Sequence, residues 1–209
     1  MRAIPREVND ALVRDADHAY ALGLWCADGY WWPSSIGLSN VEPELIVRFA
    51  HYLSRVLSQE RLRLRIYEVQ GDAPSENVLR LTDRISIRPA SKMKRTAYHL
   101  YVNSRPLVRS FFEAKRRLAE VPDVYLGPYF AGRFDGDGCW GSTPRIAYTT
   151  REEAETDRVL LKRIQIQEAS VLFYEGAREY CIYVQRPAWK RFEKLIRAHS
   201  WKVNRRFTL

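Results

Sequence analysis

Two segments decide the fold: Ala21-Leu22-Gly23-Leu24-Trp25-Cys26-Ala27-Asp28-Gly29 and Phe130-Ala131-Gly132-Arg133-Phe134-Asp135-Gly136-Asp137-Gly138. They lie 109 residues apart, and both keep glycine at the third position and end in Asp-Gly. The match extends on both sides, where Tyr20 aligns with Tyr129 and Trp31 with Trp140. A match at a fixed offset indicates two tandem copies of one structural unit.

The similarity continues beyond these segments. Residues 36–40 align with 146–150, and residues 101–106 align with 183–187. Hydrophobic spacing predicts the order helix-strand-strand-helix-strand-strand-helix in residues 1–120 and again in 121–209. We therefore expect one compact monomer of the α+β class, in which two αββαββα units related by a pseudo-twofold axis form a continuous, saddle-like antiparallel sheet.

The expected elements follow from apolar periodicity. In the first unit we expect helices over 10–27, 42–58 and 105–119, and strands over 30–32, 35–40, 61–69, 78–88 and 98–103. In the second we expect helices over 122–135, 151–167 and 187–199, and strands near 139 and over 145–149, 171–174 and 179–185.

Small residues recur four positions apart in both segments, at Gly23 and Ala27 and at Gly132 and Gly136. A stripe of small side chains lets two helix backbones approach closely. We therefore expect the two helices to pack on each other.

Both segments also place an acid at the end of a helix. We expect Gly29 and Gly138 to end the helices in the left-handed conformation, which puts the preceding aspartates in the last turn. The helix dipole disfavours a carboxylate there by about 0.3–1 kcal/mol, and helix termination leaves nearby carbonyl oxygens unpaired. Such oxygens suit Mg²⁺, so the predicted metal ligands are Asp28, Asp137, Ala27 and Gly136. In the alternative interpretation, the carboxylates belong to ordinary solvated Asp-Gly turns.

Both segments resemble the LAGLIDADG motif of homing endonucleases, in the single-chain form that carries the motif twice. The resemblance covers nearly the whole chain. It implies that Asp28 and Asp137 are catalytic and hold Mg²⁺, with Mn²⁺ as a substitute, and that the chain cuts double-stranded DNA at a long asymmetric site, leaving short 3′ overhangs. The first motif departs from the family pattern at Cys26 and the second at Arg133, and neither position binds the metal in the family.

The composition favours a polyanionic partner. The 209 residues include 34 Lys and Arg against 25 Asp and Glu, a formal net charge of +9, and 27 of the basic residues are Arg. Arginine binds phosphates and base edges through paired hydrogen bonds. The sequence has no apolar run typical of a membrane span and no signal peptide, so we expect an intracellular protein, cytoplasmic or nucleoid-associated.

Alternating residues predict basic sheet faces in the first unit. Residues 61–66 alternate Arg with Leu or Ile, and residues 79–88 largely alternate apolar with basic or hydroxyl side chains. A strand of this kind buries one face and presents the other to phosphates and base edges, although an ordinary solvated face alternates in the same way. The second unit is less basic, and the predicted DNA-binding residues are Arg61, Arg63, Arg65, Arg80, Thr82, Arg84, Ser86, Arg88, Arg145 and Arg178.

Other polar residues are candidates for assisting roles. Those that would surround the attacking water are Asn40, Thr150, Asn103, Gln185 and Lys94. Further phosphate contacts are expected from Lys92, Lys94, Arg95, Lys202, Arg205 and Arg206.

Two other classes of function remain open. One is a nucleic-acid-binding protein on the same scaffold, either an intron RNA maturase or a DNA-binding protein that does not cleave. The other is a structural basic protein, such as a ribosome-associated module. The two helix-end acids favour the nuclease, because a structural basic protein has no need of them.

Overall fold

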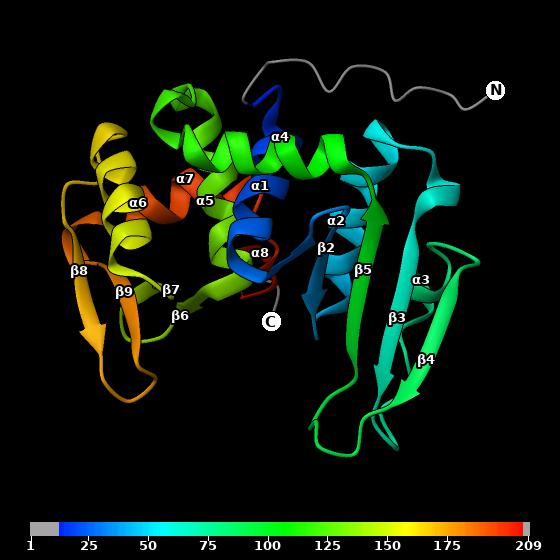
Figure 1. Cartoon of the computed structure of the whole chain (residues 1–209). Helices are drawn as coiled ribbons and strands as arrows, with labels where there is room; N and C mark the ends of the chain where they lie inside the picture. The colour runs from blue at the N-terminus through cyan, green and yellow to red at the C-terminus, as the bar shows by residue number, and fades with distance from the viewer. Residues whose placement is uncertain (1–12, 207–209) are drawn as a thin grey trace. The chain divides into compact units, whose positions relative to one another are not determined.

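The computed structural model describes residues 13–206, which form two compact units (Figure 1). Unit 1 comprises residues 28–116, and unit 2 comprises residues 13–27 together with 117–206. The sequence repeat predicts halves that meet at residue 120. The units differ from these halves because helix α1 (Ala16–Asp28) belongs to unit 2 as far as Ala27.

Unit 1 contains a five-stranded sheet in the order β1-β2-β5-β3-β4. Its strands are β1 (Gly29–Trp32), β2 (Ser35–Asn40), β3 (Arg63–Glu68), β4 (Ile85–Pro89) and β5 (Ala97–Asn103). Neighbouring strands are antiparallel, as expected, except that β3 and β4 run parallel. Parallel neighbours need a crossover connection, which here contains the one-turn helix α3 (Glu76–Leu79).

The predicted strand over 78–88 is wrong in its first half. Arg80 caps the end of α3, where its guanidinium lies 2.9 Å from the Glu76 carboxylate one turn earlier. Thr82 is buried, and its hydroxyl donates a hydrogen bond to the Leu62 carbonyl. Because β4 begins only at Ile85, the alternation before it belongs to a helix and a turn.

Two longer helices cover one face of this sheet, α2 (Pro43–Val56) and α4 (Arg105–Arg116). α2 starts with proline and buries Leu45, Phe49 and Leu53 at four-residue spacing. From α4, Phe111 meets Phe49 edge to face, with ring centroids 6.4 Å apart. The core of unit 1 therefore lies between these helices and the sheet.

Unit 2 contains an antiparallel four-stranded sheet in the order β6-β7-β9-β8. Its strands are β6 (Gly138–Trp140), β7 (Pro144–Tyr148), β8 (Ala169–Tyr174) and β9 (Glu179–Val184). Helices α5 (Asp123–Asp137) and α6 (Arg151–Arg163) pack against them, and α7 (Trp189–Arg197) and α8 (Trp201–Arg206) follow. Short 3-10 helices lie over Leu118–Glu120 and Arg186–Ala188, at the ends of predicted helices, and α8 was not expected. Each unit has its own hydrogen-bonded sheet, rather than a share in one continuous sheet.

α1 and α5 pack closely within unit 2, as the small residues predict. A Cβ atom on Gly23 would lie 2.0 Å from the Tyr129 carbonyl oxygen, and one on Gly132 would lie 2.1 Å from the Tyr20 carbonyl oxygen. These approaches leave no room for any side chain. Both positions therefore require glycine.

Asp28 and Asp137 are the last residues of α1 and α5, as expected. The expected left-handed glycines after them are wrong, because Gly71 is the one glycine with positive φ in residues 13–206. Gly138 is extended, with φ −86° and ψ 149°. It is glycine for a different reason, since a Cβ atom there would lie 2.4 Å from the Phe134 carbonyl oxygen.

Candidate metal centre and nucleic-acid interface

The first candidate acid, Asp28, is half-buried at the start of unit 1. Asn40, at the end of β2, donates a hydrogen bond from Nδ2 to Oδ2 of Asp28 at 2.7 Å. The backbone N–H of Glu42 donates to Asn40 Oδ1, also at 2.7 Å. Asn40 therefore lies beside this acid, and the Glu42 bond fixes which way its amide faces; its role around the attacking water stays a prediction.

Asn103 lies at the other end of the same strands. It is the register partner of Ser35, whose hydroxyl donates to its Oδ1, whereas Asn40 pairs with Tyr98. Five strand residues separate the two positions, roughly 17 Å, so Asn103 does not surround the water at Asp28. Lys94 is exposed in the loop that enters β5 on the Asn40 side, and its role stays a prediction.

The second candidate acid, Asp137, is half-buried at the end of α5. Burial raises the pKa of its carboxyl, while the positive charges of Arg133 and Lys202 act in the opposite direction. The negative charges of Glu179 and Glu153 have smaller effects, and both raise the pKa further. The Asp137 carboxyl therefore feels charges of both signs, with the cations supplied by α5 and α8.

Asp135 and Lys202 were not recognised as partners from the sequence. The buried Asp135 carboxylate accepts hydrogen bonds from the first turn of α8, and the Lys202 ammonium donates to the carbonyl oxygens of Gly136 at 2.8 Å and Gly138 at 3.0 Å. The expectation of an unpaired Gly136 carbonyl is therefore wrong. Lys202, expected to contact phosphate, points into this helix end instead.

Arg133, the departure from the motif pattern, has a structural explanation. Its side chain is 2% exposed and lies 3.4 Å from the Asp157 carboxylate. The hydroxyls of Tyr129 and Tyr148 donate to the same carboxylate, and the Arg133 guanidinium lies 4.3 Å from the centre of the Tyr148 ring. This cluster places the buried guanidinium beside a carboxylate inside unit 2, while its Nε and Nη1 atoms make no hydrogen bond.

Of the other two predicted assistants, Gln185 lies away from Asp137, and the role of Thr150 around the water stays a prediction. The hydroxyl of Thr150 caps α6 by accepting a hydrogen bond from the Glu153 N–H. Gln185 is exposed beyond the end of β9, on the Pro144 side of the sheet. Because Gly138 pairs with Ile146, Asp137 lies toward the opposite end of β7.

Some of the predicted ligand atoms suit a divalent cation, and one does not. No group of three or more His, Cys, Asp or Glu side chains suited to a metal occurs within residues 13–206. The carboxylates of Asp28 and Asp137 are hard oxygen donors of the kind that Mg²⁺ takes together with water and phosphate. The Gly136 carbonyl does not fit, because an ammonium already lies on it. The Ala27 carbonyl stays a predicted ligand.

The sheet face of unit 1 that points away from the helices is basic and aromatic. The strand register aligns Arg65 with His99 and Ser86, and Tyr67 with Arg88. The side chains of this face, by alternation with the buried positions, are Tyr30, Trp32, Ser35, Ser39, Arg63, Arg65, Tyr67, Ser86, Arg88, Ala97, His99, Tyr101 and Asn103. It bears three guanidiniums and no carboxylate among these strand residues, which suits a polyanion.

Four predicted contacts in unit 1 are not strand residues. Arg61 ends a 3-10 helix (Gln59–Arg61) and donates to the Asn103 carbonyl, and Arg84 is exposed in the turn before β4. Arg80 is exposed at the end of α3. Thr82 is buried, so its expected contact with DNA is wrong.

The corresponding face of unit 2 differs in charge. Arg145 in β7 lies over the Tyr174 ring, 5.2 Å from its centre, and Glu179 supplies a carboxylate on the same face. Arg178 is not in a strand: it lies in the turn between β8 and β9, with φ 56°. Leu172 is also exposed on this face.

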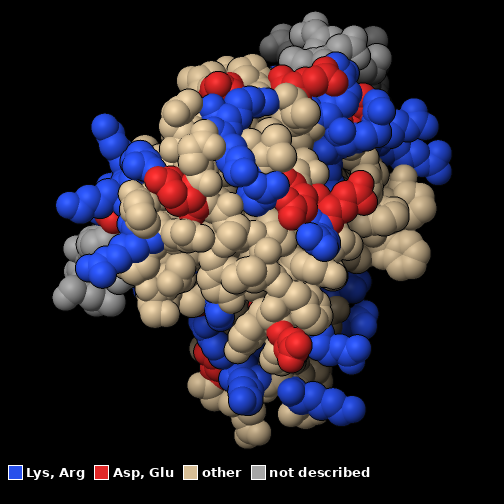
Figure 2. All heavy atoms as spheres, turned by 90° about the vertical axis from the view of Figure 1, so that its left-hand side faces the viewer, with Lys and Arg blue, Asp and Glu red and all other residues tan. Residues whose placement is uncertain are grey.

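The helical side of unit 2 carries mixed charge. Figure 2 shows Lys and Arg interspersed with Asp and Glu on the side turned to the viewer. Ion pairs between side chains of unit 2 include Arg158 with Glu155 and Arg191 with Glu168, both at 2.6 Å. Paired charges of this kind are typical of a solvated surface.

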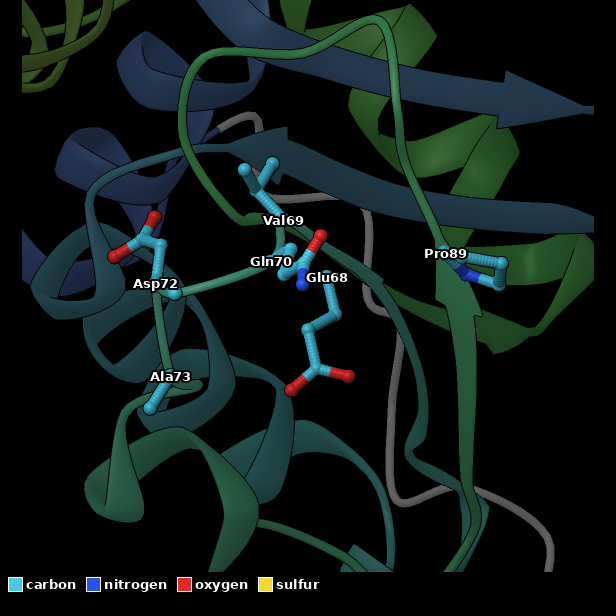
Figure 3. Close-up of a pocket in the computed structure, with 7 residues that line it drawn as sticks. Glu68, Val69, Gln70, Asp72, Ala73 and Pro89 are labelled. Carbon is cyan, nitrogen blue, oxygen red and sulfur yellow. The ribbon is translucent and has the colours of Figure 1, made fainter.

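A pocket at the far end of β3 and β4 is not a phosphate site. Glu68, Val69, Gln70, Gly71, Asp72, Ala73 and Pro89 line it, and Figure 3 shows the carboxylates of Glu68 and Asp72 in it. Asp72 accepts a hydrogen bond from the Thr96 N–H. Two carboxylates and no cation among the lining residues disfavour an anionic ligand.

Comparison with solved structures gives extensive matches. I-DmoI in complex with DNA and Ca aligns with a TM-score of 0.63 and 13% identity, over 87% of this chain and 88% of that one. I-WcaI, a homing endonuclease bound to its DNA recognition sequence, aligns with a TM-score of 0.56 and 10% identity, over 90% and 83%. The chain has the fold of the LAGLIDADG homing endonucleases.

The chain also aligns with full-length DUF199/WhiA from Thermatoga maritima, with a TM-score of 0.53 and 12% identity, over 91% of this chain and 58% of that one. No protein-family model matches the chain, and no curated protein does. Within the described residues, no helix is both long and apolar enough to cross a membrane. At these identities the comparisons establish the fold alone.

Proposed function

We propose that this protein is a site-specific, Mg²⁺-dependent endonuclease of double-stranded DNA. One observation carries the proposal: each of the two repeated helices, α1 and α5, ends in an aspartate. A carboxylate at a helix C-terminus is electrostatically unfavourable, and a nearby cation offsets that cost. The fold shared with homing endonucleases supports the same function.

The roles of the residues follow from their contacts. Asp28 and Asp137 hold the divalent cations, for which Mn²⁺ substitutes. When bound, the cation supplies Lewis-acid chemistry for phosphodiester hydrolysis. Asn40 orients the Asp28 carboxylate through its 2.7 Å hydrogen bond. The product is a double-strand break with short 3′ overhangs.

The DNA contacts differ between the units. The guanidiniums of Arg63, Arg65 and Arg88 bind phosphates and base edges from the open face of unit 1. Arg145 and tyrosines serve unit 2, so the two half-sites differ and the target is long and asymmetric. DNA bound to I-DmoI and I-WcaI supports this partner. We propose further that the protein acts as a monomer inside the cell, in the mobility of an intron.

Cleavage of a randomised duplex library in Mg²⁺, with sequencing of the cut ends, tests the proposal. The wild type should enrich one long asymmetric site, whereas the Asp28→Asn/Asp137→Asn double variant and the wild type in Ca²⁺ should not cut. If the double variant still cuts, the roles of the two aspartates are wrong.

A second candidate is a nucleic-acid-binding protein that does not cleave. The ammonium of Lys202 on the Gly136 carbonyl favours it, because this contact weakens the case for a metal at the second motif. Duplex binding without cleavage would indicate a DNA-binding protein. Preferential binding of folded intron RNA in a competition experiment would indicate a maturase.

A further inference from the structure

A buried carboxylate joins the end of α5 to the start of α8. Both Asp135 and Ser200 are fully buried, and the Ser200 hydroxyl donates to Asp135 Oδ1 at 2.6 Å. The backbone N–H groups of Trp201 and Lys202 donate to the same carboxylate at 2.7 and 3.0 Å, and the Tyr20 hydroxyl of α1 donates at 2.7 Å. Four donors satisfy this buried anion. The first turn of α8 is therefore anchored to the helix that carries Asp137.

This anchor determines where the Lys202 side chain ends. Its ammonium donates to the carbonyl oxygens of Gly136 at 2.8 Å and Gly138 at 3.0 Å, the residues on either side of Asp137. Carbonyl oxygens beside a carboxylate are also the donors that a divalent cation uses. The chain thus places a cation of its own at the predicted ligand position.

We propose that Lys202 is a built-in competitor of the divalent cation at the second motif, and that Asp135 is its positioning residue. This inference rests on the proposed function, because it assumes that Asp137 takes a metal. A divalent cation on the Gly136 oxygen would lie within about 4 Å of the ammonium, where two positive charges repel each other strongly. Metal binding at Asp137 therefore requires Lys202 to withdraw.

The first motif lacks the same anchor. Cys26 occupies the position that Asp135 has in the second motif, and a thiol does not offer the two acceptor oxygens of a carboxylate. The two acids are accordingly expected to bind cations with unequal affinity, with the Asp137 site the weaker.

Calorimetric titration of the full chain with Mn²⁺ alone, without DNA, tests the competition. Lys202→Met removes the charge and keeps most of the side-chain stem. It should tighten Mn²⁺ binding about tenfold at the site whose binding Asp137→Asn abolishes. Lys194→Met, which removes one charge from an exposed position on α7, is the matched control and should leave the affinity unchanged. Equal or weaker Mn²⁺ binding by Lys202→Met overturns the inference.

The positioning role has its own readout. Ser200→Ala removes one donor to Asp135 and should speed amide exchange at Trp201 and Lys202 while tightening Mn²⁺ binding in the same direction as Lys202→Met. Faster exchange with unchanged Mn²⁺ affinity overturns the positioning role. If Mn²⁺ binding tightens but no variant cuts DNA, the inference stands and the nuclease proposal fails. If the wild type cuts DNA and Lys202→Met binds Mn²⁺ no better than the wild type, the nuclease proposal stands and the inference fails.

Discussion

Asn40 and Asp28 are joined by a 2.7 Å hydrogen bond in which the amide Nδ2 donates to the carboxylate, and the Glu42 N–H holds the amide in that orientation. We expect Asn40→Ala to slow single-turnover cleavage about tenfold, the effect of about 1.4 kcal/mol, because the Asp28 carboxylate loses the hydrogen bond that orients it. Gln167→Ala, at an exposed amide that donates to the Lys162 carbonyl, is the control and should cut at the wild-type rate. Equal rates for both variants would remove Asn40 from the site.

Breaking the buried pair of Arg133 and Asp157 should lower the free energy of unfolding far more than breaking an exposed ion pair. Arg133→Met leaves the Asp157 carboxylate buried without its cation, so we expect a loss of about 3–5 kcal/mol in the free energy of unfolding. The exposed pair of Arg80 and Glu76 provides the comparison, and Arg80→Ala should cost no more than about 0.5 kcal/mol. Urea denaturation followed by tryptophan fluorescence measures both, and equal losses would contradict the assignment.

The close packing of α1 on α5 predicts that a side chain at position 23 destabilises the fold. Gly23→Ala puts a methyl group 2.0 Å from the Tyr129 carbonyl oxygen, so α1 and α5 must separate. We expect a loss of about 3 kcal/mol or more. Gly141 is the control, because a Cβ atom there would meet nothing within 4 Å and its φ is not positive. Gly141→Ala should change the unfolding free energy by less than about 1 kcal/mol.

Acid should weaken the fold through buried histidines. Burial lowers the pKa of His99 to about 4, with the Arg65 charge acting in the same direction, and burial also lowers the pKa of His18 to about 4. The unfolded chain binds these protons near pH 6.5. The stabilisation is therefore complete above about pH 6.5 and is lost as the pH falls toward 4.

Denaturation at several pH values isolates the His99 contribution. His99→Gln should flatten part of the fall in unfolding free energy between pH 6.5 and 4. His51→Gln, at an exposed position of α2, should leave the profile as it is. A His99→Gln profile parallel to that of the wild type would show that the ring is not the cause.

Salt dependence distinguishes the basic face of unit 1 from the helical side of unit 2. Arg88→Ala should reduce the slope of log Kd against log salt for duplex DNA by about 1, because one phosphate contact is lost. Arg191→Ala breaks an ion pair with Glu168 instead and should leave the slope unchanged. An effect of Arg191→Ala equal to that of Arg88→Ala would place the interface elsewhere.

Sequence reasoning succeeded where local pattern and burial agree. The repeated glycines and aspartates predicted the packing of α1 on α5 and both helix ends, and strict alternation over residues 61–66 predicted β3. The strand over 78–88 failed because Val78, Leu79 and Leu81 suit one helical turn as well as an extended segment.

The missing parts of the site depend on distant contacts. Ser200 accepts a hydrogen bond from the Val203 N–H, a local signal that would have indicated the start of α8. The anchor of that helix, Asp135, lies 65 residues earlier in the chain. No periodicity connects the two, so the position of Lys202 was not predictable from the sequence pattern.

The membership of α1 in unit 2 has a consequence for synthesis on the ribosome. α1 leaves the ribosome before its partner α5, which is completed 109 residues later, an interval of roughly 5–20 s at ordinary translation rates. During that interval Ala19, Leu22 and Leu24, which are fully buried in the finished protein, have no partner helix to cover them. Unit 1, encoded without interruption over residues 28–116, can fold in the meantime. The nascent chain thus exposes the apolar surface of α1 until the second motif emerges, and this surface is one that a chaperone would bind.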